Sequence, residues 1–183
     1  MLDPLLFLIY INDLIESCGT NSEIYLFADD AKSFRHILDV SDNKFLQGEL
    51  HNLKDWTDKW LLRLNVKKCK VASFGRMVDN SYSYQLVDKD QSIYLDRCTQ
   101  FKDLSVLMDE QLNFKEHIHE KINKAYAMLG IIRRNFKYLT ISCFVTLYKG
   151  MVRSHLDYCS SVWSPYRKGD IEALEKVQKR RLK

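Results

Sequence analysis

Residues 23–34 of this 183-residue chain read Glu23-Ile24-Tyr25-Leu26-Phe27-Ala28-Asp29-Asp30-Ala31-Lys32-Ser33-Phe34, and they are the most informative part of its first half. The apolar and aromatic residues before the aspartates predict a strand, and the segment after them predicts a second strand. Aspartate is a favoured turn residue, so Asp29 and Asp30 mark a tight turn between the two strands. The pattern therefore predicts a β-hairpin that presents two adjacent carboxylates at its turn.

Paired carboxylates at a turn suggest metal chemistry. They repel each other, and a hard divalent cation such as Mg²⁺ offsets that repulsion while keeping coordination sites open for phosphate. An aspartate pair in a hairpin is more often only solvated, so the pair alone is a weak signal. The apolar strand that enters the pair and the small side chain of Ala28, which leaves room for a substrate, favour catalysis. Asp29 and Asp30 are therefore candidate catalytic and metal-binding residues.

Helices and further strands are predicted on both sides of the hairpin. Pro4 suits the first turn of a helix, and Leu5–Ile11 is apolar nearly all round, which predicts a helix packed on several sides. Leucines and tryptophans at helical spacing predict a second helix between Leu46 and Leu64. Short strands are predicted over residues 68–74, 82–87, 93–96 and 101–108, with the middle two forming a hairpin.

The remainder of the chain has the periodicity of helices. Asn113 and Glu116 form a candidate capping pair, and Asp170 is a candidate cap for the last helix. Between them, a helix over 141–158 follows the apolar stripe Ile118, Ile122, Ala125, Leu129 and Ile132. The predicted fold class is α+β, with an α+β unit over 1–112 and an all-helical unit over 113–183.

Composition excludes several classes of protein. With 46% hydrophobic and 28% charged residues the chain is globular, and its net charge of +4 permits nucleic-acid binding without requiring it. Five scattered cysteines without a CxxC pair argue against a disulfide framework or a zinc site, and fit a reducing compartment. The apolar run Leu5–Ile11 is too short to span a bilayer, and the only charge before it is the acidic Asp3, unlike a signal peptide. We therefore expect no membrane partner.

An ordered set of motifs resembles a known family over essentially the whole chain. Residues 4–14 and 26–32 are similar to the palm of reverse transcriptases from jockey-like non-LTR retrotransposons. The resemblance continues, in the family's order, through Trp56–Trp60, Leu64-Asn65-Val66-Lys67-Lys68-Cys69, Leu112-Asn113-Phe114-Lys115-Glu116-His117-Ile118, His155-Leu156-Asp157-Tyr158-Cys159-Ser160-Ser161-Val162-Trp163-Ser164-Pro165 and Leu174-Glu175-Lys176-Val177-Gln178-Lys179-Arg180.

This resemblance implies an RNA-directed DNA polymerase that uses Mg²⁺, deoxynucleoside triphosphates, an RNA template and a DNA primer. It makes Asp29 the metal-binding aspartate of the third palm motif and Asp30 its more peripheral neighbour. It places Lys68 where the family has a lysine suited to protonating the departing pyrophosphate, although a solvated lysine on a strand explains Lys68 equally well. It also implies that the helices after residue 112 correspond to a thumb that holds the template–primer duplex.

The resemblance also has gaps. The family's other indispensable aspartate lies upstream of the matching segment, and Met1-Leu2-Asp3-Pro4 matches the middle of a motif that usually reads Val-Leu-Gly-Pro. We therefore expect the fingers and the first palm motif to be absent, and the chain alone to be inactive as a polymerase. Asp103 and Ser105 interrupt a usual Tyr-Leu-Gly, and a polar residue in the short buried strand predicted there would reduce stability.

The basic C-terminal end is a candidate nucleic-acid-binding surface, formed by Lys176, Lys179, Arg180 and Arg181. A solvated helix face that complements the helix C-terminus is an equally favoured interpretation. Metal binding by His117 and His119, or by His155 and Cys159, is disfavoured because neither pair has enough ligands.

Two alternative functions stay open. A thumb that grips nucleic acid without chemistry would lose affinity steeply with salt. A helical interaction module, or a relic without biochemical activity, would expose an apolar patch where palm strands are missing, and that patch could drive self-association. For a protein of this family, retrotransposon replication implies the cytoplasm and the nucleus as compartments. The sequence itself shows no decisive targeting signal.

Overall fold

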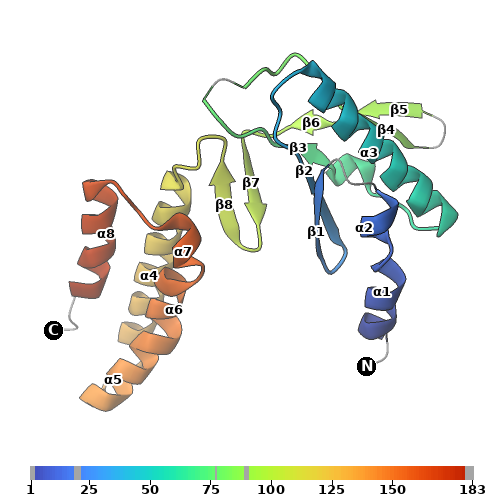
Figure 1. Cartoon of the computed structure of the whole chain (residues 1–183). Coiled ribbons are helices and arrows are strands. Elements are labelled where there is room, and N and C mark those ends of the chain that lie inside the picture. Colours follow the sequence, from blue (N-terminus) through green and yellow to red (C-terminus); the bar gives the residue numbers. More distant parts are fainter. Residues whose placement is uncertain (1–2, 19–21, 77, 89–90, 180–183) are drawn as a thin grey trace. The chain divides into compact units, whose positions relative to one another are not determined.

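The computed structural model describes residues 3–18, 22–76, 78–88 and 91–179 (Figure 1). The chain divides into two compact units: unit 1 comprises residues 1–71 and 77–98, and unit 2 comprises residues 72–76 and 99–183. The predicted α+β class is confirmed, and the described strands form four separate two-stranded sheets. The units divide after Cys98, whereas the sequence placed the boundary after residue 112, so the last hairpin belongs with the helices.

Unit 1 combines helices with short strands. Its strands pair as β1–β2 and β4–β5, both antiparallel, and as the parallel pair β3–β6. Its elements are α1 (Asp3–Ile11), α2 (Leu14–Ser17), β1 (Glu23–Phe27), β2 (Asp30–Phe34), α3 (Val40–Lys59), the 3₁₀ turn η1 (Val66–Lys68), β3 (Lys70–Val71), β4 (Gln85–Asp88), β5 (Gln91–Tyr94) and β6 (Asp96–Arg97).

The core of unit 1 lies where α1, α2 and α3 meet the inner face of β1. Its buried members are Ile11, Leu14, Cys18 and Trp56, with Phe7, Tyr10, Ile24, Leu26, Leu53 and Leu62 packed against them. The indole Nε1 of Trp56 donates a hydrogen bond to Asp13 Oδ1 at 3.2 Å, so its polar edge is satisfied inside this core. Trp56 is therefore buried, whereas Trp60, one turn later on the same helical stretch, is 38% exposed.

The prediction that α1 is packed on several sides is wrong. The core takes up only the stripe that contains Phe7, Tyr10 and Ile11. The other side of the helix is open, with Leu5, Leu6, Leu8 and Ile9 each 55–68% exposed. This unit therefore has too little apolar surface to cover a helix that is apolar on all sides.

Helix α3 begins at Val40, six residues before the predicted start at Leu46. Asp39 is its N-cap and accepts from the backbone N–H groups of Ser41 and Asp42, while the Asp42 carboxylate accepts from the backbone of Asp39. Arg35 adds an ion pair to Asp42 at 2.7 Å. Polar capping residues define this helix start, so the apolar periodicity did not reveal it.

Two predicted strands differ in the structure, and the predicted hairpin between them is present. The segment expected to be a strand from Lys68 is the 3₁₀ turn η1 followed by the two-residue strand β3. The hairpin expected over 82–96 is present as β4–β5, with its turn at 89–90 outside the described residues. The single strand expected over 101–108 is instead a hairpin, because Leu104 and Ser105 adopt φ values of 42° and 67° and reverse the chain.

Unit 2 joins that hairpin to a helical array. The helix expected over 141–158 is present as α5, the π-helical segment η2 and α6 in direct succession. The elements of unit 2 are β7 (Gln100–Asp103), β8 (Val106–Asp109), α4 (Lys115–Asn135), α5 (Ile141–Leu147), η2 (Tyr148–Arg153), α6 (Ser154–Asp157), α7 (Ser160–Trp163) and α8 (Lys168–Lys179).

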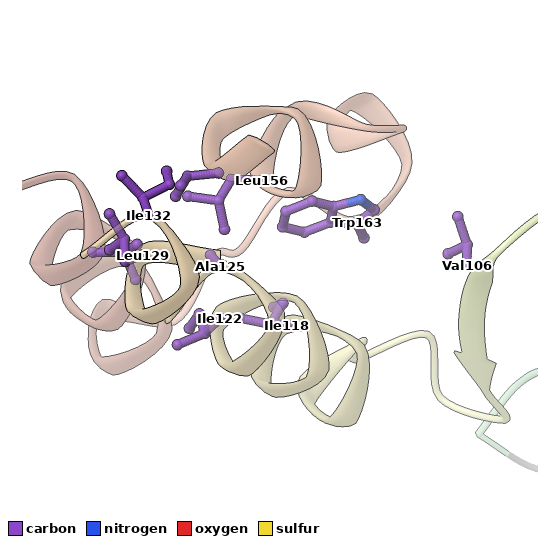
Figure 2. Close-up of a cluster of buried hydrophobic side chains, with 10 residues drawn as sticks. Val106, Ile118, Ile122, Ala125, Leu129, Ile132, Leu156 and Trp163 are labelled. Atoms are coloured by element: carbon purple, nitrogen blue, oxygen red, sulfur yellow. The ribbon is translucent and has the colours of Figure 1, made fainter. Parts of the chain in front are cut away.

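The long helix α4 carries the core of unit 2. All five residues of the predicted stripe, from Ile118 to Ile132, are buried, which confirms that prediction. Figure 2 shows Leu156 and Trp163, from the segments that follow α5, beside this stripe, with Val106 on β8. Val152 and Val177 complete the buried set and tie η2 and α8 to α4.

The two caps predicted in unit 2 are wrong. Helix α4 has Phe114 as its N-cap, at φ 56°, and Asn113 does not cap it. The carboxylate of Asp109 instead accepts from the backbone N–H groups of Gln111, Asn113 and Phe114 at 2.8–3.2 Å, which organises the turn before the helix. Helix α8 begins at Lys168, so Asp170 lies in its first turn rather than before it.

Candidate functional site

The tip of the β1–β2 hairpin carries Asp29 and Asp30, as predicted. Phe27 pairs with Asp30, so the loop consists of only Ala28 and Asp29. Ala28 has φ 52°, a left-handed conformation that costs a non-glycine residue about 1 kcal/mol. Both aspartates are exposed. The hairpin therefore holds two adjacent carboxylates in solvent on a strained turn, and such strain is common at functional sites.

Alternation along β1 explains how this turn is held. Ile24 and Leu26 point to the core of unit 1 and are partly buried there. Tyr25 and Phe27 point to the opposite face and are 58% and 57% exposed. A slip of one residue in register would exchange these faces, so the buried pair fixes where the turn falls.

Neither carboxylate is neutralised by the described part of the chain. No hydrogen bond or ion pair joins Asp29 or Asp30 to another described residue. Their oxygens are the hard donors that Mg²⁺ prefers, but it takes six ligands in near-octahedral geometry. Among the described residues, no group of three or more His, Cys, Asp or Glu side chains could hold a metal ion. The pair could supply part of the ligand set of a magnesium site, but the described residues do not complete that set.

Lys68 lies in unit 1, in the turn η1 rather than on the predicted strand. Its backbone N–H donates to the carbonyl of Asn65 at 2.9 Å, and its side chain is exposed. No hydrogen bond or ion pair connects its ammonium to Asp29 or Asp30. The structure thus does not bring Lys68 into contact with the aspartates, and its proposed role as a proton donor stays a prediction.

The basic end of α8 is only partly described. Lys176 and Lys179 are exposed in the last turn of the helix, and Lys179 forms an ion pair with Glu175 at 2.5 Å. Arg180 and Arg181 lie outside the described residues. The buried Val177 between the two lysines packs against α4, so this helix has one anchored and one solvated face. Nucleic-acid binding at this surface stays a prediction.

Sequence reasoning missed a second basic cluster, which lies in unit 2. Lys102 on β7 and Lys121 and Lys124 on α4 line one cavity with Tyr158. Lys121 is 5% exposed, which is rare for a lysine. The spacing of Lys121 and Lys124 puts both on one side of α4, and that was the available signal. Lys102 could not be added to them because the β7–β8 turn had been predicted as continuous strand.

His117 has a structural position. It is 1% exposed, and its Nδ1 accepts a hydrogen bond from the backbone N–H of Leu107 at 3.0 Å, which places its proton on Nε2. That Nε2 is buried without a hydrogen-bond partner among the described residues, and its ring meets the Trp163 ring edge-on at 5.3 Å. Burial and the nearby Lys121 lower the pKa of His117 to about 4. His119, by contrast, is 54% exposed, so the two histidines do not share a site.

Comparison with known proteins identifies no family. No family model matches the chain, and no solved structure matches it. Over 73 residues the chain is 33% identical to an uncharacterized protein of Caenorhabditis elegans. The match covers 40% of this chain and 37% of that protein, so the chain spans well under half of that relative. Separately, none of the described helices is long and apolar enough to cross a membrane.

Proposed function

We propose that this chain is part of an RNA-directed DNA polymerase of the jockey-like non-LTR type, comprising the aspartate turn of a palm and a thumb-like helical unit. The observation that carries the proposal is the placement of Asp29 and Asp30. Asp29 lies in the exposed two-residue turn beside the strained Ala28, and Asp30 follows it directly, on a hairpin held by its buried inner face. The ordered motifs of the sequence supply the family, and the helical unit 2 agrees with the expected thumb.

The proposed chemistry is nucleotide addition in the intact enzyme. There, two Mg²⁺ ions activate the primer 3′-hydroxyl and stabilise the leaving oxygen, and carboxylates hold both ions. Asp29 and Asp30 would contribute one side of that ligand set. The described residues place no further carboxylate beside them, so we propose that this chain does not polymerise by itself. The remaining ligands would come from a segment that carries the first palm motif.

A chimera tests the catalytic half of the proposal. Residues 4–183 would replace the corresponding segment of an active non-LTR reverse transcriptase, and primer extension on an RNA template would be measured with Mg²⁺. We expect extension by the chimera, and loss of more than about 100-fold in rate when Asp29→Ala removes a metal ligand. Asp55→Ala, an exposed aspartate of α3, is the matched control and should extend normally. Equal extension by the chimera with and without Asp29→Ala would refute the assignment.

The non-catalytic candidate, a remnant that only binds nucleic acid, is favoured by the lysine cluster in unit 2. Three lysines line one cavity, and none of them belongs to the hydrophobic core cluster of α4. Phosphate contacts would make duplex binding fall steeply with salt. The chimera experiment distinguishes this candidate from the polymerase proposal, because a chain that only binds would not restore extension.

A further inference from the structure

A cavity of about 410 Å³ lies in unit 2, where the β7–β8 turn meets α4 and α6. Its lining comprises Lys102, Ser105, Lys121, Lys124, Ser154, His155 and Tyr158. Three of these side chains are cationic, three carry hydroxyls, and no carboxylate is among them. The lining thus offers many hydrogen-bond donors under a net positive charge, which suits an anion.

Lys121 is the innermost of the three cations. Its ammonium donates a hydrogen bond to the carbonyl of Ser105 at 3.3 Å and lies 5.6 Å from the centre of the Tyr158 ring. An ammonium has three donors, and the described residues supply one hydrogen-bond acceptor. Its pKa is lowered by burial and by Lys124. A buried cation with donors to spare is costly unless an acceptor approaches it.

The frame around Lys121 is rigid. The Tyr158 hydroxyl donates to the carbonyl of Leu104 at 2.9 Å, which joins α6 to the tip of the β7–β8 turn. The left-handed conformations of Leu104 and Ser105 make that turn tight and present its carbonyls to the cavity side. Lys124 forms an ion pair with Glu120, one turn earlier on α4. These contacts hold Lys121 and Lys124 in place before any ligand arrives.

We propose that this cavity binds a phosphate group, with Lys121 as the buried anchor and with Lys102 and Lys124 at the rim. Phosphate oxygens would accept from the free ammonium donors and offset the repulsion among three lysines. The phosphate group can belong to a nucleic-acid backbone or to free phosphate or pyrophosphate, which share this chemistry. The inference deepens the proposed function and rests on it only for the source of the phosphate.

The test compares two double variants of the full chain. Lys102→Gln/Lys124→Gln removes the two rim cations, and Lys137→Gln/Lys149→Gln removes two exposed lysines of the same unit away from the cavity. Fluorescence anisotropy would report binding of a labelled RNA–DNA hybrid across a salt series. We expect the rim variant to bind about tenfold more weakly with a salt slope lower by about 1 to 2, and the control to change less than about twofold.

A second probe separates the sources of phosphate. Pyrophosphate binding would be followed by ³¹P line broadening with the same proteins. If the rim variant loses binding of both the hybrid and pyrophosphate while the control variant keeps both, the site binds a backbone phosphate. If the rim variant loses only pyrophosphate binding, the cavity binds phosphate but takes free phosphates rather than a nucleic-acid backbone. This conclusion does not depend on the result of the chimera experiment with Asp29→Ala. Equal losses in both double variants, or unchanged binding of both probes, would overturn the proposal.

Lys121→Gln provides a further check on the anchor. Because Lys121 is buried, thermal unfolding would first establish that the variant folds. A folded Lys121→Gln chain should lose the pyrophosphate signal, and full retention of that signal would overturn its role as anchor. If the variant does not fold, the rim variant, altered only at exposed or half-exposed side chains, decides the question.

Discussion

A substitution at a residue with a left-handed backbone conformation tests the stability of the β7–β8 turn directly. Ser105 has φ 67°, a region in which glycine carries no steric penalty, and its side chain is exposed. We predict that Ser105→Gly stabilises unit 2 by about 0.5–1 kcal/mol, because it relieves the strain of a side chain there. The free energy of unfolding in urea measures this. The interaction of Lys121 is preserved, since it uses the backbone carbonyl of residue 105.

Ala127→Gly is the control for that substitution. Ala127 is exposed in the middle of α4, where glycine should cost about 1 kcal/mol. If Ser105→Gly also destabilises the protein, the turn is not strained in solution and the hairpin is not formed as described.

His117 gives unit 2 a predictable pH dependence. Its pKa is about 4 in the folded chain and 6.5 ordinarily, so the unfolded chain binds the proton first as pH falls. Stability should therefore decline from pH 6.5 to about 4 and level off below, by on the order of 3 kcal/mol for this group. Denaturation at several pH values measures the slope. His117→Gln should flatten it and the exposed His119→Gln should not; equal slopes in all three proteins would contradict the burial of His117.

Local sequence was informative about the aspartates and uninformative about the lysines. Asp29 and Asp30 sit in a turn because the alternating strand before them and their own turn preference act within a few residues. Lys121 is buried because a turn sixteen residues earlier folds over it, and no periodicity of α4 signals that contact.

Among elements, α3 depends on its capping box. Asp39 accepts from two backbone N–H groups that have no partner inside the helix. We predict that Asp39→Ala costs unit 1 about 1 kcal/mol, measured by urea denaturation. Asp55→Ala, at an exposed position in the C-terminal half of the same helix, should have little effect. A cost at Asp55 as large as that at Asp39 would mean that helix charge, rather than capping, is responsible.

Helix α1 has the exposed apolar side that self-association would use. Leu6 and Ile9 are 56% and 68% exposed beside Leu5 and Leu8. Because monomeric proteins rarely leave contiguous apolar surface open, we predict concentration-dependent association that Leu6→Lys/Ile9→Lys reduces. Sedimentation velocity measures the species present. The matched control is Lys137→Gln/Lys149→Gln, and a wild-type chain that stays monomeric at high concentration would contradict the prediction.

A helix whose apolar residues repeat regularly over several turns was predicted well, whereas a hairpin that depends on its turn was not. The α4 stripe recurs over four turns and every member is buried. The strand predicted over 101–108 was wrong because Leu104 and Ser105, which reverse the chain, are not residues that favour left-handed turns. Asp109, which organises the start of α4, lies at the end of the preceding strand rather than at the helix N-cap, so it was not recognised.

At the scale of the whole molecule, the α+β class followed from where apolar periodicity changes along the chain. The division into units did not, because a hairpin of strand-like composition packs with the helices of unit 2. The unit that carries Asp29 and Asp30 and the unit that carries the lysine cavity are distinct. The proposed catalytic and binding functions can therefore be tested separately.

The most direct test of the central claim follows binding and extension in one experiment. The chain and Asp29→Ala would each be titrated onto a labelled primer on an RNA template with Mg²⁺ and deoxynucleoside triphosphates, with anisotropy and primer length read from the same samples. We predict that both proteins bind the duplex, that binding weakens steeply with salt, and that neither lengthens the primer. Extension by the chain that disappears in Asp29→Ala would contradict the claim that it is inactive alone. Failure of both proteins to bind would contradict its assignment to a nucleic-acid enzyme.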